Sequence, residues 1–210
     1  MKYTKDSPER ALVGIENELK LLRAAQALVS QILHDLISPY SALSTGLDIV
    51  SDHKGELWKM MILSKNQMGV LLSLFRAIFA TGDLPISETQ RLLNQWLEDR
   101  FQLHNPVPDQ MLVLYPKVVL GIIFWLTQQS MVRKGSLGIR MTPRAVIFSL
   151  QSGGVKQDAS QDLILEEGCA EPVPQQSYAY FIYLLLKDQD LRVRVYRKET
   201  ILEVHVLENV

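Results

Sequence analysis

The hydrophobic positions at the start of the chain recur with the spacing of an α-helix. From Ser7 to Ser51 the apolar residues fall mostly three, four or seven positions apart, which places them in one stripe on a helix surface. They are Leu12, Ile15, Leu19, Leu22, Val29, Leu33, Leu36, Leu43, Leu47 and Val50. Pro39 is the main interruption. The pattern predicts one long amphipathic helix, followed by a polar connector at residues 51–55.

A second amphipathic helix is predicted from Glu56 to Ala80. Its seam positions alternate in steps of four and three, as in a heptad repeat with one polar member. They are Leu57, Met61, Ser64, Met68, Leu71, Phe75 and Ile78. Two helices joined by a short connector form an antiparallel hairpin, but a hairpin alone cannot bury both stripes. We therefore expect a homodimer whose hairpins close a four-helix bundle. The alternative is a hairpin that packs only against the rest of the chain.

After residue 82 the pattern changes to short helices and strands in mixed order. Helices are predicted at 87–101, with Ser87 as N-cap, and at 116–133 and 175–186. Strands are predicted at 111–115, 136–141, 144–151, 163–165, 191–196 and 201–207, with a polar loop at 152–162. The fold class predicted for the whole chain is α+β. Residues 1–82 would form the helical hairpin domain, and residues 83–210 an α/β sandwich with helices on one face of a mixed sheet.

Composition narrows the range of functions. The net charge of −1 and the lack of a basic run argue against nucleic-acid binding. Cys169 is the only cysteine, which excludes a disulfide framework and a cysteine-based zinc site, and His53, His104 and His205 do not have metal-ligand spacing. The first residues lack the apolar core of a secretion signal, and the longest apolar runs are too short to span a bilayer. We therefore expect a cytoplasmic protein that does not contact a membrane.

His34 is the residue of greatest chemical interest, because an acidic residue follows it directly and Pro39 comes five positions later. Proline inside a helix removes a backbone donor and clashes with the carbonyl four residues earlier, here that of Asp35, at a cost of about 3 kcal/mol. Strain beside the one side chain whose unperturbed pKa lies near neutrality indicates a functional histidine. Periodicity alone would favour an ordinary surface or packing histidine.

The run from His34 to Pro39, with the Gly46–Asp48 step, resembles the start of the ChpT-type histidine phosphotransferases of alphaproteobacterial phosphorelays. A second similarity is Phe75–Phe79 with Gly82, which resembles the arginine–phenylalanine–glycine end of that family's second helix. The resemblance starts near residue 28 and is stronger in the hairpin than in the C-terminal half. It implies a dimeric bundle followed by a histidine-kinase ATPase-like sandwich. It also implies a phosphotransferase that passes phosphoryl groups between receiver domains, including that of a hybrid histidine kinase.

Sensor histidine kinases are the wider relatives that this resemblance implies, and they hold ATP with an asparagine-bearing helix and glycine-rich loops. Here the helix at 116–133 contains no asparagine, with Gly121 and Gln128 where amides or acids would be expected. Gly153 and Gly154 stand without a glycine-rich repeat, so the phosphate cradle and metal ligands are missing. We therefore expect no intrinsic cofactor, with Mg²⁺ supplied by the partner receiver. The alternatives are an ATP-using kinase and a non-catalytic scaffold or antikinase.

The resemblance makes His34 the expected phosphoacceptor, since neutral imidazole can accept a phosphoryl group and release it again. Asp35 is the expected orienting acid, as the adjacent acid is in the related kinases, and a hydrogen bond to the ring would fix its tautomer. The alternative for Asp35 is an ordinary solvated acid. Pro39 is assigned a structural role.

Two further polar residues are expected to contact the phosphoryl group or a partner. Ser38 lies one turn after His34 on the same helix face, although it could instead bond back to its own helix. Arg76 comes to a similar height when the hairpin folds back, by the helical rise of about 1.5 Å per residue. A surface ion pair of Arg76 is equally consistent with the sequence. The apolar landing patch for a receiver is expected to comprise Ile37, Ser41, Leu72 and the exposed part of Phe79.

Overall fold

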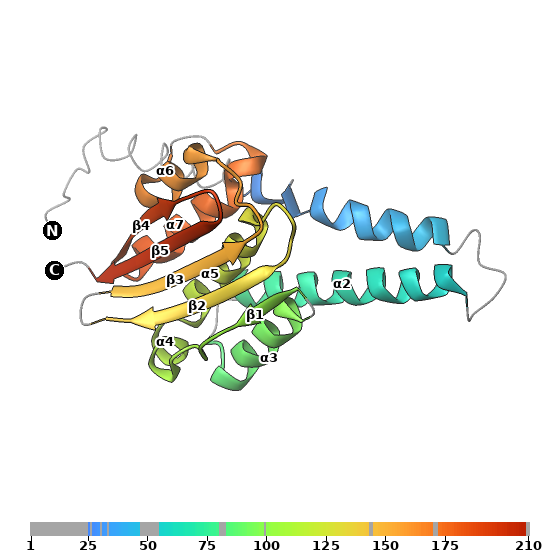
Figure 1. Cartoon of the computed structure of the whole chain (residues 1–210), viewed down its shortest axis with the longest axis horizontal. Helices are drawn as coiled ribbons and strands as arrows, with labels where there is room; N and C mark the ends of the chain where they lie inside the picture. The colour runs from blue at the N-terminus through green and yellow to red at the C-terminus, as the bar shows by residue number, and fades with distance from the viewer. Residues whose placement is uncertain are drawn as a thin grey trace, which may run out of the picture.

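The computed structural model describes residues 25, 27–29, 31–32, 34–46, 55–79, 83–98, 100–142, 145–169 and 172–208, except the side chains of 57 and 113. The described residues between 25 and 46 are helical and are called the N-terminal helix here. This helix runs antiparallel to α2 (Glu56–Phe79), and the pair projects from the rest of the molecule (Figure 1). The predicted hairpin is thus confirmed where it is described. The predicted helix before residue 25 and residues 51–54 of the connector lie outside the described residues.

Four of the seven seam positions predicted for α2 are buried, while Ser64 and Met68 are half-buried. Met61, Leu71, Phe75 and Ile78 are at most 5% exposed. At the outer end of the hairpin the two helices approach closely, because a Cβ added at Gly46 would lie 2.4 Å from Cγ of Met61. Only glycine permits that approach. The inner part of α2 belongs to the same hydrophobic core as the C-terminal half.

The described strands form one five-stranded mixed sheet with the order β1-β2-β3-β5-β4. Their bounds are β1 Phe101–Leu103, β2 Gly135–Met141, β3 Ala145–Ser152, β4 Leu191–Arg197 and β5 Ile201–Glu208. β1 pairs parallel with β2, and the other neighbours are antiparallel. Alternate residues face the core, so that Ile139, Phe148 and Val204 form one buried row across three strands.

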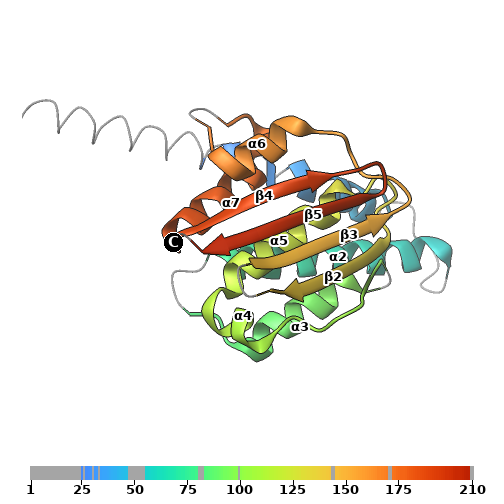
Figure 2. The ribbon, with the colours of Figure 1, turned by 60° about the vertical axis from the view of Figure 1, so that its left-hand side comes forward.

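Helices cover one face of this sheet and leave the other face open to solvent, as the view in Figure 2 shows. The helices are α3 Ile86–Leu97, α4 Asp109–Leu114, α5 Pro116–Gln129, α6 Ala159–Glu167, the short 3₁₀ helix η1 Pro174–Gln176 and α7 Ser177–Asp188. α5 is the central helix, since nearly all of its residues are buried. The α+β class is therefore observed, with a helical N-terminal part and a C-terminal sandwich of helices on one face of a mixed sheet. The division at residue 82 stays a prediction.

The strand predicted at 111–115 was wrong, because this segment forms α4 and its continuation to Tyr115. A short apolar run does not distinguish a buried strand from a buried helical turn. Here Pro108 and Asp109 start a helix, and Met111 and Leu112 face the core. Tyr115 leaves the helical region because Pro116 follows it and restricts its backbone. Pro116 then begins α5, as predicted.

Two other boundaries also differ from the prediction. The segment at 163–165 is not a strand but the middle of α6, and the predicted loop ends where Asp158 caps that helix by accepting a hydrogen bond from the backbone N–H of Gln161. Although burial opposes it, hydrogen bonds from Ser160 and Gln161 lower the pKa of Asp158. α3 ends at Leu97 and is preceded by Pro85, so Ser87 is not its N-cap, and Phe101 belongs to β1.

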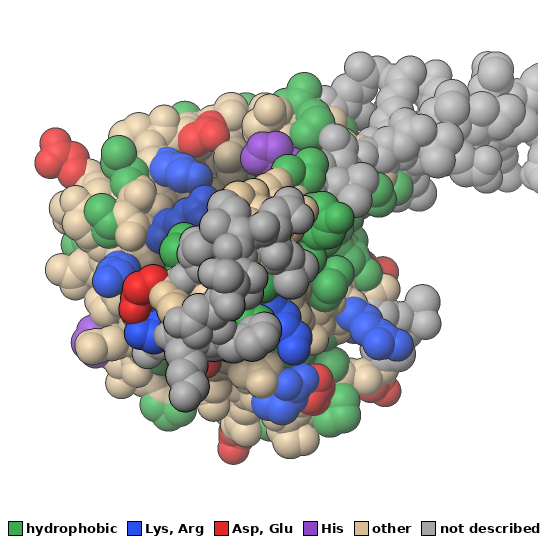
Figure 3. Space-filling model, turned by 90° about the vertical axis from the view of Figure 1, so that its right-hand side faces the viewer, with side chains coloured by type: hydrophobic (Ala, Val, Ile, Leu, Met, Phe, Trp, Pro, Cys, Tyr) green, Lys and Arg blue, Asp and Glu red, His purple; other side chains and the backbone are tan. Residues whose placement is uncertain are grey.

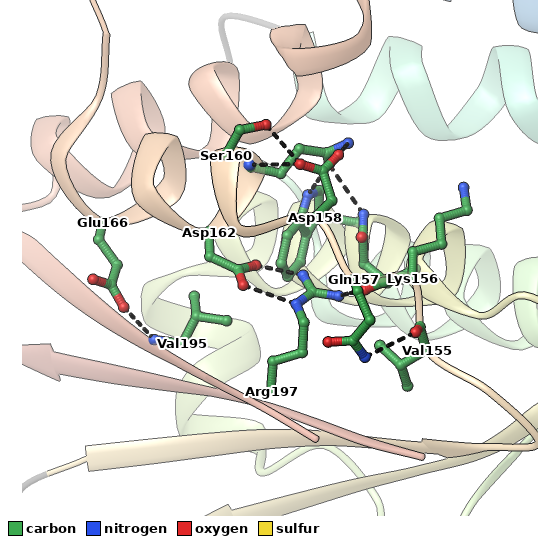
Figure 4. A network of polar contacts seen from close by, with 12 residues as sticks. Val155, Lys156, Gln157, Asp158, Ser160, Asp162, Glu166, Val195 and Arg197 are labelled. Carbon is green, nitrogen blue, oxygen red and sulfur yellow. Dashed lines mark hydrogen bonds and ion pairs between the residues drawn. The ribbon is translucent and has the colours of Figure 1, made fainter. Parts of the chain in front are cut away.

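A network of polar contacts fixes α6 to the sheet (Figure 4). The guanidinium group of Arg197, at the end of β4, donates to both carboxylate oxygens of Asp162 on α6, with 2.8 Å between Nε and Oδ2. Arg197 also donates to the backbone carbonyl of Lys156 and lies over the ring of Trp125. The Arg197 and Asp162 side chains are only 8% and 18% exposed. This pair is therefore a largely buried crosslink between a helix and a strand.

Candidate functional site

The imidazole of His34 projects into solvent from the N-terminal helix, with 80% of its side-chain surface exposed. The helix continues through Pro39, which is buried, while the backbone carbonyl of Asp35 loses the partner that a non-proline residue would supply. The opposite side of this helix, which includes Leu28, Ile32 and Leu36, packs toward the core. His34 is thus held on a packed helix and is accessible to another molecule.

The carboxylate of Asp35 forms three hydrogen-bonding contacts. Its Oδ1 accepts from Nε2 of Gln31 at 2.9 Å and lies 3.3 Å from Nδ1 of His34. Its Oδ2 accepts from the hydroxyl of Tyr178 at 2.8 Å. A ring that donates its Nδ1 proton to Asp35 leaves the lone pair of Nε2 free. The arrangement can therefore fix the imidazole in the tautomer that attacks through Nε2.

Tyr178 connects this carboxylate to the C-terminal half. It stands in the first turn of α7, and its ring stacks on Phe75 of α2 with 5.7 Å between centroids. It also meets Phe124 of α5 edge-on at 5.0 Å. Burial, together with the charge and hydrogen bond of Asp35, raises the pKa of Tyr178 well above its ordinary value, so the hydroxyl remains a donor.

Replacement of Tyr178 by phenylalanine tests this connection. The change keeps the ring contacts but leaves the Asp35 carboxylate without one donor, and we expect unfolding to become easier by about 1.5–3 kcal/mol. Urea denaturation measures the loss. Tyr196→Phe is the matched control, because Tyr196 is exposed on β4 and has no described contact with Asp35. Equal stability of the two variants would show that the hydroxyl contributes nothing to the fold.

A polar cleft of about 220 Å³ opens beside His34, between the hairpin and the ends of α3 and α5. Asp35 and Pro39 also line it. Its further polar lining residues are Ser38, Gln67, Arg100, Thr127, Gln128 and Arg133. Its inner wall is fixed by a buried hydrogen bond of 2.9 Å from Nε1 of Trp96 to Oγ1 of Thr127. The cleft thus brings two arginines and several neutral polar residues together with the exposed histidine.

The residues proposed from sequence divide into two groups. His34, Asp35, Ser38 and Pro39 line the cleft together. The others lie outside its lining: Ile37, Ser41, Leu72 and Arg76 are exposed on the hairpin, and Phe79 is half-buried against Phe181. Their proposed contacts with a partner stay predictions.

Sequence reasoning missed Tyr178, Arg100 and Arg133. Tyr178 lies 143 positions from the carboxylate that it contacts, and no local pattern marks that pairing. The position of Arg100 and Arg133 at the cleft depends on the pairing of β1 with β2. β1 is a strand of three residues that was not predicted from the sequence.

The described part of the chain contains no group of three or more His, Cys, Asp or Glu side chains placed to hold a metal ion. None of the described helices combines the length and the apolar character needed to cross a bilayer.

Comparison with known proteins identifies the fold. No protein-family model matches the sequence, and no curated protein matches it either. The solved structure of a bacterial phosphotransferase superposes with a TM-score of 0.69 and 18% sequence identity, covering 88% of this chain and 96% of that one. The Acinetobacter baumannii histidine kinase AdeS superposes with a TM-score of 0.43 and 13% identity, covering 84% of this chain and 98% of that one. The chain therefore shares the fold of a bacterial phosphotransferase over most of its length.

Proposed function

We propose that this protein is a histidine phosphotransferase that relays phosphoryl groups between receiver domains of two-component signalling proteins through His34. The observation that carries the proposal is the exposed imidazole whose Nδ1 lies against a carboxylate that is itself fixed by two other residues. The fold shared with a bacterial phosphotransferase supports the same conclusion. So does the resemblance of the sequence around His34 to ChpT-type proteins.

The proposed reaction needs only groups that the site and a phosphorylated receiver supply. Nε2 of His34 attacks the phosphorus of an aspartyl phosphate, and an N–P bond forms while the acyl P–O bond breaks. The electron pair of the broken bond returns to the receiver carboxylate. The ring becomes cationic on phosphorylation, and its Nδ1 proton stays hydrogen-bonded to Asp35, so no proton has to leave. Transfer to a second receiver is the reverse of these steps.

The resemblance to ChpT-type proteins implies the partners. One receiver, belonging to a hybrid histidine kinase, would donate the phosphoryl group, and the receiver of a response regulator would accept it. Each receiver would bring its own Mg²⁺ to neutralise the charge of the transferred group. Exposed Ile37 and Leu72 lie on the hairpin as candidates for the apolar landing patch. We propose that the relay operates in the cytoplasm.

Incubation with a receiver domain phosphorylated with ³²P tests the proposal. We expect label to move to this protein and to remain bound in alkali but not in acid, as is characteristic of an N–P bond, and mass spectrometry should locate it on His34. ATP alone should give no label. If the receiver binds but no label is transferred, the protein is a scaffold and the relay proposal is wrong.

The exposed hydrophobic side chains of the hairpin support the proposed homodimer. Tyr40 and Leu63 are 62% and 67% exposed, and Met60 and Ile62 are also open to solvent. The face of the molecule seen along the hairpin shows hydrophobic side chains beside lysines and arginines (Figure 3). A second hairpin packed against this one would bury them in a four-helix bundle.

The dimer is tested by replacing Leu63 with glutamate. We expect wild-type protein to have about twice the 23.9 kDa mass of one chain in light scattering, and Leu63→Glu to shift it toward one chain, because a buried charge opposes association. Leu114→Glu is the control, since Leu114 is similarly exposed but lies on α4. A monomeric wild type would remove the bundle from the proposal.

A further inference from the structure

The parallel pairing of β1 with β2 brings two arginines together beside His34. Phe101 is in register with Gly135, and the backbone N–H of Gly135 donates to the carbonyl of Arg100 at 3.1 Å. Parallel strands begin at the same edge of a sheet, so the residues just before them are neighbours in space. Arg100 precedes β1 and Arg133 precedes β2, and both residues line the cleft that contains His34.

The backbone at Arg133 has an unusual conformation that the surrounding turn maintains. Its φ of +51° lies in the left-handed region, which is uncommon for a residue other than glycine, asparagine or aspartate. Ser130 closes the turn, because its carbonyl accepts from the N–H of Arg133 and its hydroxyl donates to the carbonyl of Lys134 at 3.1 Å. Strained residues cluster at functional sites. A sequence under pressure for stability alone would favour glycine or asparagine here.

The charges around the cleft favour an anionic ligand. The ion pairs formed among the described residues involve neither Arg100 nor Arg133. The carboxylate of Asp35 already accepts hydrogen bonds from Tyr178 and Gln31. Guanidinium groups bind phosphoryl oxygens through short charge-assisted hydrogen bonds.

We propose that Arg100 and Arg133 bind the non-bridging oxygens of the phosphoryl group carried by His34. This inference rests on the proposed relay function and adds the groups that stabilise the transferring charge. It assigns to these two residues the phosphoryl contact that the sequence suggested for Arg76. Arg76 lies outside the cleft lining, in the last turn of α2.

Three variants test the two arginines. Arg133→Asn removes the charge with a residue that tolerates left-handed backbone, Arg133→Lys keeps the charge, and Arg100→Gln removes the second guanidinium group. We expect Arg133→Asn and Arg100→Gln each to slow transfer from a phosphorylated receiver about tenfold to a hundredfold, as for loss of a hydrogen bond to a charged group. Arg133→Lys should lie between Arg133→Asn and wild type. Arg140→Gln is the control, because Arg140 is exposed on β2 outside the cleft lining.

A second measurement needs no receiver and separates this inference from the relay proposal. Phosphoramidate, a small-molecule phosphoryl donor, can modify the exposed His34 chemically, and ³¹P NMR then follows the titration of the phosphoryl group. Nearby guanidinium groups stabilise its dianion, so we expect its pKa to be higher in Arg100→Gln and Arg133→Asn than in wild type. Unchanged ³¹P titration in both variants would overturn the arginine assignment. If wild-type protein accepts no label from the receiver but the ³¹P titration still differs between wild type and the variants, the relay proposal is wrong and the arginine assignment stands.

Discussion

Replacing His34 with glutamine is expected to abolish transfer of label from a phosphorylated receiver. Glutamine keeps a polar side chain of similar length but offers no nucleophilic nitrogen. Because the imidazole is 80% exposed and packs little, the change should leave the fold intact. Autoradiography after a time course of incubation measures the transfer, and thermal unfolding checks the fold.

His104→Gln is the matched control for this experiment. His104 is also exposed, lies in the loop after β1, and is not part of the cleft lining. The His104→Gln variant should accept label at the wild-type rate. If His34→Gln and wild type are labelled equally, the phosphoryl group sits on another residue and the proposed site is wrong.

Replacing Asp162 with alanine is expected to destabilise the protein more than any surface change, by about 3–5 kcal/mol, because it leaves the buried guanidinium group of Arg197 without its charge partner. The loss is large beside the 5–15 kcal/mol that holds a typical domain together. A shift of the urea midpoint with an unchanged slope would measure it as a loss of stability.

Two comparisons define the origin of this loss. Glu56→Gln breaks the ion pair between Glu56 and Lys59, whose side chains are 83% and 65% exposed respectively. It should have little effect on the free energy of unfolding. A double variant, Asp162→Leu with Arg197→Met, removes both charges and should recover much of the stability that Asp162→Ala loses. A double variant as unstable as Asp162→Ala would mean that lost packing, not the unpaired charge, causes the effect.

The hairpin could be predicted from sequence because its signal is local. The heptad spacing of Met61, Leu71, Phe75 and Ile78 fixes which side of α2 is buried, whatever it packs against. The final hairpin of strands could be predicted for the same reason, since alternation and the turn between β4 and β5 are both contained in about 18 residues.

Elements whose identity depends on context were predicted less well. Met111–Leu114 reads as a strand by composition, but a proline and an aspartate before it start a helix. The sequence did contain a signal for α6, because Asp158 precedes Gln161 at the spacing of a capping motif. The apolar run at 163–165 favours a strand when it is considered by itself, but the helix that Asp158 starts includes it.

The site itself was predictable only on one helix. His34, Asp35 and Ser38 are neighbours in sequence, so their proximity follows from helical geometry. Tyr178 and the two arginines reach the site through tertiary packing and through strand pairing across more than 30 residues. One sequence carries no record of such contacts, which only the folded chain brings together.

The open surroundings of the imidazole have a consequence for how the relay would behave. A ring with four-fifths of its surface in solvent can be reached from the donor and from the acceptor by the same approach. Nothing in that geometry favours one direction of phosphoryl transfer over the other. The ratio of phosphorylated to unphosphorylated receivers would therefore set the net direction of transfer. Such a protein brings the donor and acceptor receivers to equilibrium with each other and does not store the phosphoryl group.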